Sequence, residues 1–277
     1  MKHSLHVTLL LAAMFFLAQL IGVLILDTYV TTETIIVDNV TTTTQTWAPL
    51  PYNLERPEFE EETSYIPLIT VILAATGLAL ILIKFKAFTL WKLWFFLSVW
   101  FCLLVALKIF FGAPIAFLLA VLFAILKVFT PNIYTHNLTE LFIYAGLAVV
   151  FVPILTIGSA AILLILIAIY DAIAVWKTKH MVSLAQFQSK LKLFAGFMIP
   201  YKNGKHTAIL GGGDIGFPLL FTGAVMKLYG LSSIIISITV TLSLLALLFL
   251  AEKGRFYPAM PFLAAGCFVG YGVLLLV

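Results

Sequence analysis

Two acidic residues stand apart in this chain because they lie inside long apolar runs. Eight of the twelve acids fall between residues 27 and 62, and Glu140 and Glu252 lie at the ends of apolar runs, where water is near. Asp171 and Asp214 are the two that remain. A charged side chain at the centre of a membrane helix costs about 2.5–3.5 kcal/mol on insertion scales, so each is a candidate for a functional role.

Two carboxyl groups that meet away from bulk water can share one proton, because ionising both would place two like charges side by side. The ionised group can then take a proton from water, and the protonated group can donate a hydrogen bond to the carbonyl under attack. These roles are sufficient for peptide hydrolysis without a covalent intermediate. Neither Asp171 nor Asp214 can face lipid cheaply, so the best partner for each is the other.

The residues next to the two acids have more than one explanation. Gly211, Gly212 and Gly213 directly precede Asp214. Glycine in a helix interior costs roughly 1 kcal/mol relative to alanine, so three together favour a loosened helix or a close approach of another backbone. Helix packing through small residues explains the glycines slightly better when they are taken alone. Tyr170, beside Asp171, could supply a hydroxyl or pack as an aromatic side chain.

A proline pair opens the last apolar run, in the order Pro258, Ala259, Met260, Pro261. Prolines leave backbone groups without helical partners, so this segment could bind an extended chain, although a plain helix start explains it equally well. The two cysteines, Cys102 and Cys267, lie in apolar runs, where we expect them to act as small hydrophobic residues. We therefore expect no disulfide, no metal site and no cofactor.

The elements that must position these residues are membrane helices. The chain has 277 residues, of which 63% are hydrophobic and 10% charged, whereas about a quarter of the residues of soluble domains are charged. A bilayer admits only helices and closed barrels, and barrel strands would alternate apolar and polar residues. The apolar runs here are continuous and near the roughly 20 residues of a spanning helix. We expect an all-α integral membrane protein with the lipid bilayer as its partner and no binding of nucleic acid.

Nine apolar runs predict about nine transmembrane helices. Their approximate bounds are 5–26, 66–83, 88–111, 113–130, 138–155, 157–176, 208–229, 231–250 and 258–277. The fifth and sixth runs are separated at Pro153 and at the small residues from Thr156 to Ser159. The first run is longer than the apolar part of a signal peptide and lacks a clear cleavage site, so we expect it to be retained.

Two polar stretches lie between the runs. Residues 27–65 are rich in threonine, proline and acid, and we expect a loop with no domain of its own. Residues 177–207 carry six lysines, while Met181, Leu184, Leu191, Phe194 and Met198 recur near helical spacing. A short helix on the membrane surface and an ordinary solvated loop are equally good explanations of this second stretch.

The distribution of charge predicts the orientation of the chain. If the N-terminus lies in the cytosol and the C-terminus outside, twelve of the sixteen basic residues face the cytosol and eight of the twelve acids lie in the outer loop. Asp171 is then five residues before Trp176, and Asp214 is six residues after Ala208. At a rise of 1.5 Å per residue, both acids lie roughly 8–9 Å below the same membrane boundary.

These residues together resemble the GxGD intramembrane aspartyl proteases, in which the motifs read Tyr-Asp, Gly-x-Gly-Asp and Pro-Ala-Leu. Tyr170 and Asp171 match the first motif, Gly211 to Asp214 the second, and Pro258, Ala259 and Met260 the third, with methionine in place of leucine. The resemblance covers about residues 157–277. It implies a catalytic pair of Asp171 and Asp214 that hydrolyses transmembrane helices of membrane-protein substrates through an activated water.

The resemblance also implies which branch of the family is nearer. Signal peptide peptidases place the loop between the two aspartate helices outside, whereas the lysines of 177–207 place it inside, as in presenilins. The compact chain is similar to a microbial, archaeal presenilin homologue, which implies a multi-pass protein of a cell membrane that needs no obligate partner subunits. We expect an N-terminal bundle of five helices at 1–156, with its acidic outer loop, and a catalytic part of four helices at 157–277, with its basic cytosolic loop.

Two other functions were weighed against proteolysis. A proton- or cation-coupled transporter could use the same two acids as a relay, but transporters usually show internal repeats or interrupted helices in both halves, and we find no convincing repeat. A polytopic scaffold would leave two costly buried acids without a purpose. Proteolysis is therefore the function that the sequence favours.

Overall fold

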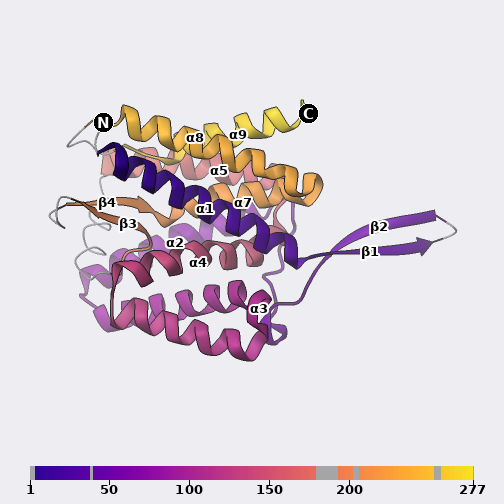
Figure 1. Ribbon diagram of the computed structural model, residues 1–277, viewed down its shortest axis with the longest axis horizontal. Helices are drawn as coiled ribbons and strands as arrows, with labels where there is room; N and C mark the ends of the chain where they lie inside the picture. The colour runs from indigo at the N-terminus through magenta and orange to yellow at the C-terminus, as the bar shows by residue number, and fades with distance from the viewer. Residues whose placement is uncertain (1–3, 38–39, 179–192, 202–205, 253–256, 277) are drawn as a thin grey trace.

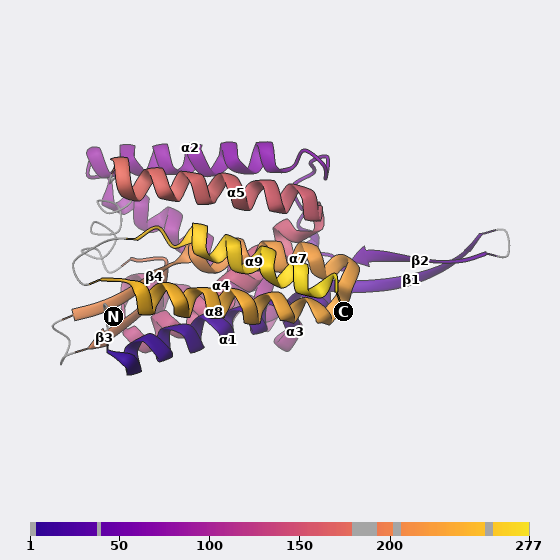
Figure 2. The ribbon, with the colours of Figure 1, turned by 90° about the horizontal axis from the view of Figure 1, so that it is seen from above.

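The computed structural model describes residues 4–37, 40–178, 193–201, 206–252 and 257–276. They form a helical bundle with two small antiparallel hairpins (Figures 1 and 2). The helices are α1 (Leu5–Tyr29), α2 (Tyr65–Lys84), α3 (Phe88–Phe129), α4 (Ile133–Phe151), α5 (Ile157–Ile173), α7 (Gly212–Tyr229), α8 (Ile234–Leu250) and α9 (Met260–Leu274). The strands are β1 (Val30–Val37), β2 (Val40–Trp47), β3 (Gly196–Tyr201) and β4 (His206–Gly211).

The predicted number of nine spanning helices is wrong. Among the described residues, six helical stretches are long and apolar enough to cross a membrane, and the apolar helix α9 is shorter. The six are Leu5–Tyr29, Tyr65–Leu82, Phe88–Phe129, Ile133–Ile154, Ile157–Lys177 and Gly212–Leu250. Large apolar side chains on their outer faces, such as Leu118 at 68% exposure, fit an environment of lipid. The predicted orientation of the chain in the membrane stays a prediction.

A glycine accounts for part of the difference in number, because two of the predicted runs meet in one helical stretch. The runs 88–111 and 113–130 are the two helical parts of α3, which are joined by a kink where Gly112 has a φ of 70°. On either side of Gly112 the two parts of α3 pack together, with Val99 and Leu103 in one cluster with Ala120. Such a φ is open to glycine at little cost, so Gly112 joins the two parts of α3 directly, with no loop between them.

The predicted break between the fifth and sixth runs is confirmed. Helix α4 ends at Phe151, a short turn at Val152–Ile154 contains Pro153, and α5 begins at Ile157. The Thr156 hydroxyl accepts the backbone N–H of Ser159, which is the usual way for a threonine to cap a helix N-terminus.

The stretch 27–65 contains a hairpin that the sequence analysis did not predict. Strands β1 and β2 pair from Val30 with Trp47 to Val37 with Val40. Figure 1 shows this hairpin projecting from the end of the bundle at which α1 finishes. Threonine favours strands, so the run Thr41 to Thr44 was an available signal for β2.

A second hairpin replaces the start of the predicted run 208–229. Strand β4 pairs with β3 from Tyr201 opposite His206 to Gly196 opposite Gly211, and α7 begins only at Gly212. Met198 therefore lies in a strand, which is neither the surface helix nor the solvated loop that the sequence left open for this stretch. Met181, Leu184, Leu191 and most of the lysines of 177–207 lie outside the described residues.

Helix α7 is the central element of the bundle. Ten of its side chains and glycines between residues 215 and 225 are buried, and α1, α4, α5, α8 and α9 all contact it. The Gln19 side chain of α1 donates a hydrogen bond of 2.8 Å to the carbonyl oxygen of Ile215. The beginning of α7 is thus held in the interior, close to the β3–β4 hairpin.

Candidate active site

Asp171 lies near the end of α5, two residues before its last residue, Ile173. Its Oδ2 accepts a hydrogen bond of 3.1 Å from the backbone N–H of Met260, and the backbone N–H of Ala259 lies near the same carboxyl group. Met260 is the first residue of α9, and Ala259 caps that helix. The first N–H groups of a helix lack partners within the helix and readily bind an anion, so α9 provides a ready seat for the carboxylate.

The proline pair explains why these two N–H groups are available. Ala259 caps α9, and its carbonyl accepts the N–H groups of Phe262 and Leu263. Pro261 has no N–H of its own, and Met260 provides the donor that reaches Asp171. Of the two explanations left open for the proline pair, the structure shows the helix start at Met260, and the N–H of Met260 is occupied by Asp171.

Asp214 lies in the first turn of α7, three residues after the capping residue Gly211. Its carboxyl group lies near the backbone N–H of Gly211. An acid at the third helical position is placed to reach back toward the cap in this way. The three glycines consequently lie at the junction of β4 and α7, not in the interior of a helix as predicted.

Two of the glycines allow close approach at this junction. A Cβ at Gly211 would lie 3.2 Å from Oδ2 of Asp214, and a Cβ at Gly212 would lie 2.8 Å from the hydroxyl oxygen of Tyr144. The N–H of Gly212 donates to the carbonyl of Ala195 at 3.0 Å. The structure thus favours the close-approach explanation of these glycines over a loosened helix.

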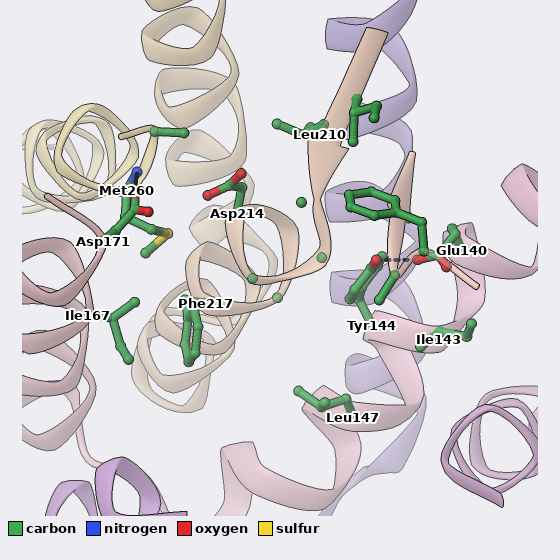
Figure 3. A pocket seen from close by; sticks show the side chains of 18 of the residues that line it. Glu140, Ile143, Tyr144, Leu147, Ile167, Asp171, Leu210, Asp214, Phe217 and Met260 are labelled. Atoms are coloured by element: carbon green, nitrogen blue, oxygen red, sulfur yellow. Dashed lines mark hydrogen bonds between the residues drawn. The ribbon is translucent and has the colours of Figure 1, made fainter. Parts of the chain in front are cut away.

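The two aspartates line one cavity of about 1190 Å³. Figure 3 shows Asp171 beside Met260 on one wall and Asp214 on the facing wall, with Ile167 and Phe217 next to them. The two carboxyl groups are close enough to interact electrostatically. Asp171 lies two residues before the last residue of α5, and Asp214 lies two residues after the first residue of α7, whereas the sequence analysis placed Asp214 six residues inside its apolar run.

The other predicted site residues surround this pair. Tyr170, the three glycines, Ala259 and Met260 also line the cavity. Pro258 precedes the cap of α9, and Pro261 is the second residue of that helix. The structure brings all of the predicted residues to one end of the bundle, where two carboxyl groups, apolar walls and a strand meet.

Glu140 and its neighbours are the part of the site that the sequence analysis missed. Glu140 was predicted to lie near water. It is instead only 1% exposed, and it forms an ion pair with Lys127 at 2.6 Å. It lines the same cavity as the aspartates and accepts the hydroxyl of Tyr144. The spacing of His136, Glu140 and Tyr144 at intervals of four was an available signal, because it places them on one face of a helix.

Metal-binding side chains do not gather in the described part of the chain. No group of three or more histidine, cysteine, aspartate or glutamate residues is placed to hold a metal ion there. Cys102 and Cys267 are free thiols.

Comparison with known proteins identifies the family. The sequence model described as signal-peptide peptidase, presenilin aspartyl protease matches residues 52–277. A presenilin family intramembrane aspartate protease solved in space group C222 is 21% identical, with a TM-score of 0.67 over 98% of this chain and 99% of that chain. One solved in space group P2 is 20% identical, with a TM-score of 0.64 over 96% of this chain and 97% of that chain.

These structural matches show a common fold, and no curated protein sequence matches the chain. The family model, in contrast, covers most of the chain, including both aspartates and the first turn of α9. The chain belongs to the signal-peptide peptidase and presenilin family, and it is an intramembrane aspartyl protease.

Proposed function

We propose that Asp171 and Asp214 are the catalytic pair and that they hydrolyse peptide bonds within transmembrane segments of membrane proteins. The observation that carries this proposal is the facing position of the two carboxyl groups in one cavity. One carboxylate takes a proton from the attacking water while the other acid donates its proton to the carbonyl oxygen. Two like groups that meet in one cavity hold one proton between them more readily than they hold two charges.

The cavity supports a substrate that is apolar and locally extended. Apolar side chains such as Leu147, Leu163 and Leu248 form much of its wall. The strand β4 also lines it, through Thr207, Ile209 and Leu210, and leads directly to Asp214.

One edge of β3 is already engaged, because the Asn137 side chain of α4 bonds both the N–H and the carbonyl of Met198. We propose that an unwound substrate segment pairs with β4, which would present its carbonyl groups to the two acids.

We also propose that the chain works without partner subunits in the cell membrane of a microbe, such as an archaeon. The support is its compact length and the coverage of nearly the whole of the similar solved chains. Purified protein in detergent or liposomes tests this directly, because cleavage by the chain alone requires no other subunit.

The test of the catalytic pair uses a fluorescence-quenched peptide that carries one apolar transmembrane segment. Asp171→Asn and Asp214→Asn should each abolish cleavage, since neither variant retains two carboxyl groups. Asp27→Asn, which alters an exposed acid of α1, is the matched control and should cleave normally. Normal cleavage by either active-site variant would rule the proposal out.

A further inference from the structure

A cluster of buried polar side chains lies beside the active site and has no role in the chemistry proposed above. Lys127 of α3 donates to Oε1 of Glu140 at 2.6 Å and lies 3.1 Å from Nδ1 of His136. Nε2 of His136 lies 2.8 Å from the carbonyl oxygen of Gly196, the first residue of β3. Lys127 and Glu140 are each 1% exposed, so the charges are paired inside the protein.

Tyr144 connects this cluster to the aspartate-bearing helix. Its hydroxyl donates to Oε2 of Glu140, the bond that Figure 3 marks with a dashed line. A Cβ on Gly212 would lie 2.8 Å from that hydroxyl oxygen and 3.2 Å from a ring carbon. Real Cβ atoms essentially never approach another atom as closely as 2.8 Å, so the seated tyrosine fills the space that a side chain at residue 212 would need.

The position of Gly212 in turn decides the position of Asp214. Gly212 is the first residue of α7 and is fixed on its other side by the bond from its N–H to Ala195. Asp214 follows two residues later, within the same turn, and its Oδ2 would lie 3.2 Å from a Cβ on Gly211. A displacement of Gly212 therefore moves the carboxyl group of Asp214 relative to Asp171.

We propose that Tyr144, seated by Glu140, is a positioning residue that holds the start of α7 so that Asp214 faces Asp171. The inference rests on the proposed function, because it assigns Tyr144 a role only through Asp214. Tyr144 and Gly212 form a matched pair, because the hydroxyl of Tyr144 occupies the space that a side chain at residue 212 would need. A misplacement of about 1 Å in a catalytic group can cost about a hundredfold in rate, so the contact matters for catalysis more than for binding.

Tyr144→Phe tests the seat directly, because it removes the bond to Glu140 and keeps the ring. With the quenched transmembrane peptide as substrate, we expect kcat to fall at least tenfold while KM changes less than twofold. A peptide mimic of the transition state that carries a hydroxyl group in place of the scissile carbonyl should bind at least tenfold more weakly. The control is Tyr29→Phe, at the last residue of α1. It removes another buried tyrosine hydrogen bond, to the carbonyl of Val105, and should leave kcat unchanged.

A second variant keeps the proposal testable if Tyr144→Phe folds poorly. Gly212→Ala should reduce kcat at least tenfold in the native chain, because its Cβ meets the Tyr144 hydroxyl. In the Tyr144→Phe background the same substitution should cost less than a further threefold, because the nearest remaining atoms lie at 3.2 and 3.3 Å. An equal loss in the two backgrounds would overturn the pairing.

The outcomes separate this inference from the proposed function. If Asp214→Asn abolishes cleavage while Tyr144→Phe retains the native kcat, the positioning role is wrong and the catalytic pair stands. If Asp214→Asn still cleaves, the catalytic pair itself is wrong. A parallel loss of kcat and of binding of the transition-state mimic in Tyr144→Phe, with native KM and thermal stability, supports the positioning role.

Discussion

At the scale of single residues, Lys127 and Glu140 show how this protein places charge in its interior. Both side chains are almost fully buried, and each has more than one polar neighbour: Lys127 contacts His136, and Glu140 accepts the Tyr144 hydroxyl. Burying an isolated charge is very costly, whereas a pair with complete hydrogen bonding can be accommodated. The loss of one of the two residues should therefore lower the free energy of unfolding more than the loss of both charges together.

This dependence predicts the stability of three variants. Lys127→Met leaves the Glu140 charge without its cation and should lower the free energy of unfolding by about 3–5 kcal/mol. The double variant Lys127→Met with Glu140→Gln removes both charges and should recover most of that loss, which thermal unfolding in detergent can measure. Glu61→Gln is the control, because its ion pair with Lys227 is exposed and worth at most about 1 kcal/mol. A double variant as unstable as Lys127→Met alone would contradict the argument.

At the scale of elements, the two predicted aspartates line one cavity, but the backbone that carries Asp214 differs from the predicted helix. Asp171, Asp214 and the proline pair were found because charge and proline are conspicuous within apolar runs. The strand β4 was not predicted. Its six residues, His206 to Gly211, are of mixed polarity and look like the beginning of the next apolar helix. Its pairing with β3 is a contact between segments, which periodicity within one segment does not reveal.

Helix α9 offers a prediction at this scale, because its position sets the donors to Asp171. It packs on α8 through small residues, and a Cβ on Gly266 would lie 2.9 Å from Cα of Val240. Gly266→Ala should push the helices apart, destabilise the protein by about 1–3 kcal/mol and lower kcat. Gly272 of the same helix has no atom within 4 Å of its Cβ position, so Gly272→Ala should be neutral or stabilising by up to about 1 kcal/mol. Thermal unfolding and cleavage assays of the two variants give the comparison, and equal effects would contradict it.

At the scale of the whole molecule, the cavity extends from the aspartates to the outer surface of the bundle. Four residues of α2 line it: Leu68, Val71, Ile72 and Thr76. Val71 both lines the cavity and is 59% exposed, so the wall that α2 provides reaches the surface. Figure 2 shows α2 at the edge of the bundle beside α5, the helix of Asp171. An apolar segment can therefore approach the site from the side, through a wall that is itself apolar.

This arrangement of the molecule was only partly open to prediction from sequence. Composition and continuous apolar runs gave a helical membrane protein, but the assignment of one span to each run failed where α3 bends at Gly112. A count of runs assumes that a separate helix corresponds to each run. A glycine with positive φ allows the chain to turn, and helical hydrogen bonding resumes directly after it. The large cavity likewise depends on which helices pack closely and which stand apart, and that is a property of the assembled bundle.

The lateral wall predicts a separation between substrates of different size. Thr76→Trp adds a bulky side chain to the cavity wall, so a peptide with a full transmembrane segment should show a KM at least fivefold higher with kcat changed less than twofold. A short transition-state mimic that occupies only the region of the two aspartates should bind with native affinity, because it does not extend to α2. Ile81→Trp, at a position of the same helix that is 52% exposed, is the matched control and should leave KM unchanged. If Thr76→Trp weakens the short mimic as much as the long substrate, α2 acts on the aspartates themselves and the wall is not a passage for the transmembrane segment.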